Sequence, residues 1–147
     1  MKTTLLSLLI LLKVLAPVVV MADSSPGNTG EIVLTITGFE DSKGIAKVAL
    51  VNSKENYSED KPYKGFNFEI IDNKVVQTIS NLPNGEYAIK VFHDENSNHE
   101  LDTRMFGIPA ERYGFSNNAR GSFGPPDYEE AAFKVSSSST RVEIEVQ

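Results

Sequence analysis

The chain has 147 residues, with 14 basic and 20 acidic residues, a formal net charge of −6 and no cysteine. The acidic balance, without a cluster of Lys and Arg, argues against nucleic acid as a partner, because contact with phosphates needs such a cluster. The lack of cysteine excludes a disulfide framework and a lipoprotein anchor, so the fold must rely on its hydrophobic core, to which metal ligation can add.

The first 22 residues have the pattern of a secretory signal peptide. Lys2 supplies the positive amino-terminal region, residues 5–20 form an apolar run broken by Lys13, and Val-Met-Ala at 20–22 provides a cleavage site. The alternative is a retained amphipathic or membrane helix, which the short, broken run disfavours. Cleavage leaves 125 of the 147 residues. We therefore expect one exported domain over residues 23–147, periplasmic or secreted, without stable membrane insertion.

The mature chain shows the alternation of apolar and polar residues that is typical of β-strands. The predicted strands span residues 32–37, 45–51, 66–70, 75–79, 86–92, 131–135 and 141–146. The short spacing between the third and fourth predicts a hairpin, and the Asn-Gly pair at 84–85 predicts a tight turn before the fifth. Segments of helical period are absent after the leader. The pattern predicts an all-β fold, a single antiparallel β-sandwich of about seven strands, immunoglobulin-like or transthyretin-like.

Residues 93–127 do not fit a plain sandwich, because this stretch has little strand pattern. Structureless loops of this length are uncommon in compact domains and are usually functional. The long loop starts with His-Asp-Glu-Asn-Ser-Asn-His-Glu-Leu-Asp at 93–102. This start is rich in side chains that can bind a metal.

The segment that begins at Asp94 has the spacing of a calcium-binding loop. Asn96 and Asn98 stand at its third and fifth places, Glu100 supplies a backbone carbonyl at the seventh, and Asp102 stands at the ninth. Calcium takes six to eight oxygen ligands, which carboxylates, amides and carbonyls can provide. The small number of acidic ligands predicts weak affinity, with a Kd on the order of 10⁻⁴ to 10⁻³ M.

This loop departs from the calcium loop of an EF-hand. His99 stands where the sharp turn needs Gly, and Met105 stands where the bidentate Glu is expected. A further ligand would have to come from Glu111 or Asp127. The alternative is a polar turn whose Asn and Asp side chains satisfy their own backbone. Zinc is disfavoured, because the chain has only two His and no Cys.

A run of aromatic, glycine and amide residues follows at 106–118. One interpretation is a recognition surface for a polysaccharide or a protein at the cell surface, with these candidate residues: Phe106, Glu111, Arg112, Tyr113, Phe115, Asn117 and Asn118. The other is a compact loop that packs Phe106, Ile108, Tyr113 and Phe115 over one end of the sandwich.

Three motifs carry a resemblance to a known family: V-F-H-D-E-N-S-N-H-E-L-D at 91–102, G-I-P-A-E-R-Y-G-F-S-N-N at 107–118 and P-P-D-Y-E-E-A-A-F at 125–133. Together they resemble the exported bacterial family catalogued as domain of unknown function 2141, and the likeness covers nearly all of the mature chain. This sequence departs from that family at Ser97 and His99, where Gly is commoner. The resemblance implies an exported β-sandwich without an assigned activity.

Three classes of function remain to be compared. The first is an exported binding or structural module whose long loop is organised by Ca²⁺. The second is a subunit of a surface or periplasmic assembly, held by an edge strand such as residues 32–37. The third is a hydrolase that uses His93 and Asp94 with Ser116 and Glu111. It is disfavoured, because the sequence has no nucleophile elbow and no clear nucleophile, so we expect no catalytic residue.

Overall fold

The computed structural model describes residues 28–147. The predicted signal peptide and its cleavage site lie outside these residues. The elements, in chain order, are β1 Thr29–Thr37, β2 Ile45–Val51, α1 Lys54–Ser58, β3 Lys64–Glu69, β4 Val75–Pro83, β5 Gly85–Asp94, η1 Met105–Gly107, β6 Tyr113–Phe115, η2 Ser116–Asn118, α2 Tyr128–Ala131, β7 Phe133–Val135 and β8 Ser139–Glu145.

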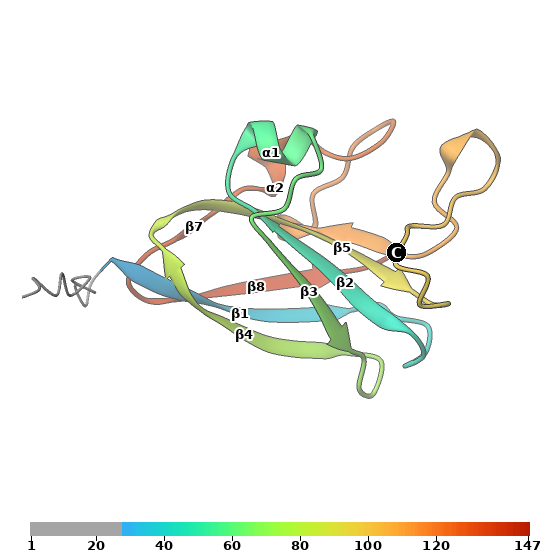
Figure 1. Cartoon of the computed structure of the whole chain (residues 1–147), viewed down its shortest axis with the longest axis horizontal. Helices are drawn as coiled ribbons and strands as arrows, with labels where there is room; N and C mark the ends of the chain where they lie inside the picture. The colour runs from blue at the N-terminus through green and yellow to red at the C-terminus, as the bar shows by residue number, and fades with distance from the viewer. Residues whose placement is uncertain (1–27) are drawn as a thin grey trace, which may run out of the picture.

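Two sheets make up the domain, which confirms the all-β sandwich (Figure 1). One sheet has the strand order β4-β1-β8, and the other has the order β3-β2-β5-β6, with β7 paired to one end of β5. All pairs are antiparallel except β1 and β8, which run parallel from Glu31 opposite Ser139 to Thr37 opposite Glu145.

The hydrophobic core lies between the two sheets and follows from the alternation in the strands. Ile32, Leu34 and Ile36 of β1 are fully buried, and they share one cluster with Leu50 of β2 and Ile89 of β5. Burial of such aliphatic side chains contributes about 1.5–3 kcal/mol each relative to exposure. This core holds the sandwich together without disulfides.

Strand β1 is the central strand of its sheet, which corrects the expected edge at residues 32–37. It pairs with β4 on one side and with β8 on the other. Ile32 and Ile36 on one face are fully buried, whereas Val33 and Thr35 on the other face are partly exposed. The prediction that this strand joins a partner through a free edge is therefore wrong, because β4 and β8 already occupy both of its edges.

The expected hairpin between the third and fourth strands is also wrong. Ile71 and Lys74 do close a tight turn, with N–O distances of 2.9 and 3.0 Å, and the two residues between them have positive φ. Beyond this single bridge the chain changes sheet, because β3 pairs with β2 whereas β4 pairs with β1. The local turn was readable from the sequence, but the partner of each strand was not.

The expected turn at residues 84–85 is shorter than predicted. Strand β4 continues to Pro83 and β5 starts at Gly85, so Asn84 is the single residue between these two strands, which belong to different sheets. The positive φ falls at Asn81 (58°), inside β4, and not at the Asn-Gly pair. The chain therefore changes sheet through an irregular strand end.

Two short helices and one short strand were not predicted. Helices α1 and α2 lie beside each other at one end of the sandwich (Figure 1), where Tyr57 and Tyr128 meet edge to face with ring centroids 5.7 Å apart. Residue 131, expected in a strand, closes α2 instead. Strand β6 lies inside the predicted long loop. Both α-helices of residues 28–147 are far too short to cross a membrane.

Candidate cation-binding loop

Asp94 is the last residue of β5 and the first of the candidate loop. Its side chain is fully buried, and its two carboxylate oxygens accept hydrogen bonds from the backbone amides of Asn98 (3.1 Å) and His99 (2.9 Å). A buried carboxylate is stable only when it is paired or hydrogen-bonded. Gly44 lies against the Asp94 backbone, where any side chain would collide with the Asp94 carbonyl. The end of β5 thus fixes this carboxylate inside the turn.

The side chains of Asn96 and Asn98 make the same pattern of hydrogen bonds in the loop. The Oδ1 atoms of Asn96 and Asn98 accept hydrogen bonds from the amides two residues later, at 3.0 and 2.8 Å. Their Nδ2 groups both donate to the Asp102 carboxylate, at 2.6 and 3.1 Å. The polar side chains at the first, third, fifth and ninth places therefore form one hydrogen-bonded cluster.

The backbone of the loop turns sharply at two places. Ser97 has φ of 58° and His99 has φ of 69°, both in the left-handed region that favours glycine. His99 is the sixth residue counted from Asp94, the place at which a calcium loop makes its sharp turn. The turn therefore forms at the expected place, although a His occupies it.

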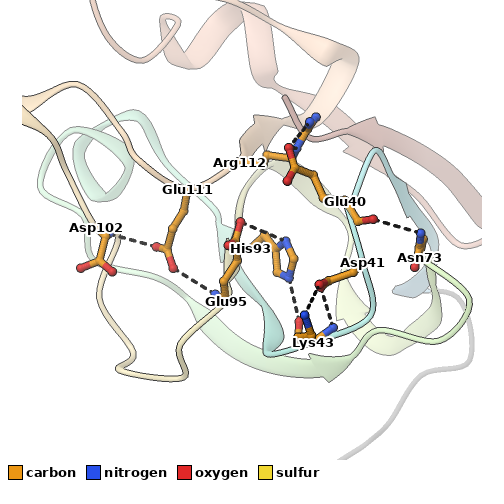
Figure 2. Close-up of polar contacts among 9 residues, drawn as sticks. All are labelled: Glu40, Asp41, Lys43, Asn73, His93, Glu95, Asp102, Glu111 and Arg112. Carbon is orange, nitrogen blue, oxygen red and sulfur yellow. Dashed lines mark hydrogen bonds and ion pairs between the residues drawn. The ribbon is translucent and has the colours of Figure 1, made fainter.

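Glu111 joins the two ends of the loop, as Figure 2 shows. One oxygen of its carboxylate accepts from the amide of Glu95 and the other from the amide of Asp102, both at 3.0 Å. The side chain is nearly buried. Of the two candidates for a further ligand, Glu111 lies at the loop. Asp127 instead lies at the start of α2, where its backbone amide donates to the Glu130 carboxylate. Sequence spacing alone could not distinguish the two.

The residues present suit a hard cation better than zinc. Asp94 and Asp102 have carboxylate oxygens and Asn96 and Asn98 have amide oxygens, which are ligand types that Ca²⁺ prefers, while the chain has no Cys for a zinc site. Within residues 28–147 no three His, Asp or Glu side chains form a group that could hold a metal. Amide and carbonyl oxygens would therefore have to complete the coordination of the two carboxylates.

His93 lies directly before the loop and is fully buried (Figure 2). Its Nε2 donates to the carbonyl of Lys43 at 2.7 Å, because a carbonyl only accepts. Its Nδ1 has no hydrogen bond and lies 3.8 Å from the Glu95 carboxylate. The ring meets Phe39 edge to face at 5.2 Å. These contacts make His93 part of the packing beneath the loop.

The segment that supports His93 carries its own ion pair. The Asp41 carboxylate accepts from the backbone amide of Lys43 at 2.9 Å and lies 3.0 Å from its ammonium. The amide, and then the ammonium, hold the pKa of Asp41 below its ordinary value. Both side chains face solvent, so the contribution to stability is small.

The aromatic residues of the predicted recognition surface separate into two groups. Phe106 is 93% exposed and Ile108 is 58% exposed, so the expectation that both pack over the sandwich is wrong. Phe115 is buried, and Tyr113 packs against the same small cluster, with an edge-to-face contact at 6.0 Å between their rings. Phe106 and Ile108 are therefore presented to solvent, whereas Tyr113 and Phe115 belong to the fold.

The polar members of that set bond within the fold. Arg112 forms an ion pair with Glu40 at 2.6 Å (Figure 2). The Asn117 Nδ2 donates to the carbonyls of Glu130 and Ala132, and the Asn118 Oδ1 accepts from the amide of Glu145 at 2.8 Å. The two Asn residues also have positive φ, of 60° and 49°. These hydrogen bonds join η2 to α2 and to the end of β8.

Comparison with known proteins places the chain in a family. Residues 34–143 match the family described as Uncharacterized protein conserved in bacteria (DUF2141), so the chain belongs to this family. Curated proteins and solved structures give no match.

Proposed function

We propose that this member of an uncharacterised bacterial family is an exported, non-catalytic binding or structural module whose 94–102 loop is organised by Ca²⁺. The observation that carries the proposal is the convergence of Asp94, Asn96 and Asn98 with Asp102 in one cluster at the end of β5. These residues come from alternate positions, as the ligands of a short calcium loop do.

The hydrogen bonds already present leave oxygen atoms for a cation. Each carboxylate oxygen has two lone pairs, and so does each Asn Oδ1, while the bonds within the loop use one of them. The Asn96 and Asn98 amides that donate to Asp102 would give way to the ion, since a divalent cation neutralises the Asp102 charge more fully than two neutral donors do. Bonds from Asp102 to Ca²⁺ would then replace its hydrogen bonds with the Asn96 and Asn98 amides.

Two side chains considered for hydrolysis support a role without catalysis. His93 and Ser116 are both fully buried. The Ser116 Oγ donates to the carbonyl of Ala131 at 2.5 Å and accepts from the amide of Ile89 at 2.8 Å. A general base and a nucleophile have to reach the substrate, whereas these two groups bond to the backbone.

Calcium binding is tested by calorimetry on the mature protein, with a chelator-treated sample as the reference. A cation that binds only the native state adds RT ln(1 + [L]/Kd), which is about 1.4 kcal/mol at ten times Kd. For a domain of this size the melting temperature should rise by about 3–8 °C. The absence of both heat and a melting shift at millimolar Ca²⁺ would show a polar turn that satisfies itself.

Matched variants separate ligands from bystanders. Asp102→Ala should abolish the calcium-dependent melting shift, because it removes a carboxylate that faces the cluster. Glu100→Ala should retain it, since the ligand proposed at that position is the backbone carbonyl. Glu95→Ala should also retain most of it. Equal loss in all three variants would contradict the proposed ligand set.

Export is tested separately by mass spectrometry of the protein from the periplasm or medium. The expected mature chain begins at or near Asp23, after the Val-Met-Ala site. An intact Met1 on the exported protein would contradict the signal-peptide prediction.

A further inference from the structure

A groove of about 670 Å³ lies on the outer face of the five-stranded sheet, away from the core between the sheets. Its floor comes from β2, β3, β5 and β6, and it is also lined by Pro62, Pro125 and Leu101 of the candidate calcium loop. Small-molecule sites have volumes of about 300–1,000 Å³ and are mostly apolar. The groove has the size of such a site.

The strand register arranges the floor of the groove in two rows. In one row Lys47 of β2 stands opposite Asn67 of β3 and Phe92 of β5, and Phe92 stands opposite Tyr113 of β6. Residues directly opposite in neighbouring strands lie close together on the same face. An ammonium and an amide therefore lie beside two aromatic rings.

The second row runs through Gly65, Ala49, Lys90 and Phe115. Gly65 lies inside β3, and a Cβ built there meets no atom within 4 Å. Glycine inside a strand weakens it and often marks a place where a ligand approaches the backbone. With Ala49 beside it, Gly65 keeps this part of the floor open.

The charges in the groove leave one cation without a partner. The Lys90 ammonium bonds with the carbonyl of Tyr57 (2.7 Å) and the carboxylate of Asp60 (2.5 Å), and it lies 4.1 Å from the Tyr57 ring centroid. Lys47, which is partly buried, has no hydrogen bond or ion pair within residues 28–147. Of the three charged residues that line the groove, Asp60 neutralises Lys90, and Lys47 remains.

We propose that this groove binds a small amphipathic acid, with a single carboxylate paired to Lys47 and an apolar body over Phe92, Tyr113 and the open floor at Gly65. The net positive charge of the groove, in a chain of net charge −6, favours an anionic group there. The apolar lining favours a hydrocarbon or aromatic body, whose burial supplies most of the affinity. None of the candidate calcium ligands lines the groove, although Leu101 lies between two of them in the chain.

The test is a two-dimensional NMR titration of the ¹⁵N-labelled mature protein with octanoate, and with octan-1-ol as the uncharged probe of equal length. Chelator is present throughout, so that the outcome does not depend on calcium. Octanoate should give saturable shifts at the amides of β2, β3, β5 and β6 that face the groove. It should bind about tenfold more tightly than octan-1-ol, the difference that a charge-assisted contact provides.

Three variants complete the test. Lys47→Gln should weaken octanoate binding about tenfold and leave octan-1-ol unchanged, whereas Lys134→Gln, an exposed lysine outside the groove, should alter neither. Gly65→Leu should weaken the binding of both probes, because the leucine side chain extends into the open floor.

The proposal is overturned if octanoate gives no saturable shifts, or if octanoate and octan-1-ol bind equally. It is also overturned if the same amides shift with protein concentration alone, which would place a second copy in the groove.

Discussion

The carboxylate of Glu111 accepts a hydrogen bond of 3.0 Å from the backbone amide of Asp102, nine residues earlier in the chain. Its other oxygen accepts from the amide of Glu95, so a single side chain closes the loop at both ends. The loop therefore has a fixed span before any cation binds. The geometry of the candidate ligands depends on this contact as much as on the ligands themselves.

Replacement of Glu111 tests the closure of the loop. Glu111→Gln should lower the free energy of unfolding by about 1–3 kcal/mol, because the Gln NH₂ group cannot accept from a backbone amide and leaves one donor unpaired. The measurement is urea unfolding, with amide hydrogen exchange over residues 95–102 as a local probe. Glu100→Gln serves as the control, since that side chain is exposed. Unchanged exchange rates in Glu111→Gln would contradict the closing role.

Glycine at position 99 should stabilise the loop. His99 has φ of 69°, a conformation that costs an ordinary L-residue about 1–2 kcal/mol and costs Gly very little. Because Gly also has more freedom in the unfolded chain, the net gain in His99→Gly should be about 0.5–1 kcal/mol. Thermal unfolding without calcium measures this. Glu100→Gly, at a residue without positive φ, should destabilise instead, and equal effects in both variants would refute the backbone argument.

Ser116 should matter for stability and not for chemistry. Its buried Oγ joins the amide of Ile89 to the carbonyl of Ala131, so Ser116→Ala leaves both backbone groups unpaired. We expect a loss of about 1–3 kcal/mol in unfolding free energy by denaturant titration. Ser122→Ala, in an exposed loop, should change it by less than about 0.5 kcal/mol. A stability equal to that of the parent protein would contradict the structural role of Ser116.

Tyr57 should make stability fall at high pH. Burial, followed by the nearby carboxylates of Asp60, Glu130 and Asp127, raises the pKa of Tyr57 from 10.0 to about 12. The folded state therefore holds the phenol proton in a pH range where the unfolded chain has lost it. This contribution is complete below pH 10 and is lost as the pH rises through about 12.

Comparison with Tyr57→Phe isolates this effect from the other tyrosines and the lysines. The variant should lose less stability than the parent between about pH 10 and 12, although the loss of the hydrogen bond to Pro126 lowers its stability near neutral pH. Denaturant unfolding over this pH range gives both slopes, and absorbance at alkaline pH follows ionisation. Parallel slopes for the two proteins would contradict the raised pKa.

The sequence by itself determined the strand-rich fold and the polar turn. The alternation at Ile32, Leu34 and Ile36 reports a strand directly, because side chains in a strand point alternately to its two faces. The left-handed turn within 94–102 follows from neighbouring Asn, Ser and His residues, which act over a few positions. The hydrogen bonds of Asn96 and Asn98 with Asp102 join residues only four to six positions apart, so they too are local to the sequence.

Only the tertiary structure decided the partners of each strand and the roles of residues far apart in sequence. Strand β1 is central because β4 and β8 both pair with it, and neither the change of sheet after Lys74 nor the parallel pairing with β8 leaves a local signal. Glu111 closes the loop because β6 returns beside β5. The groove exists for the same reason: Asn67, Lys47, Phe92 and Tyr113 come from four strands, and only their register places them in one row.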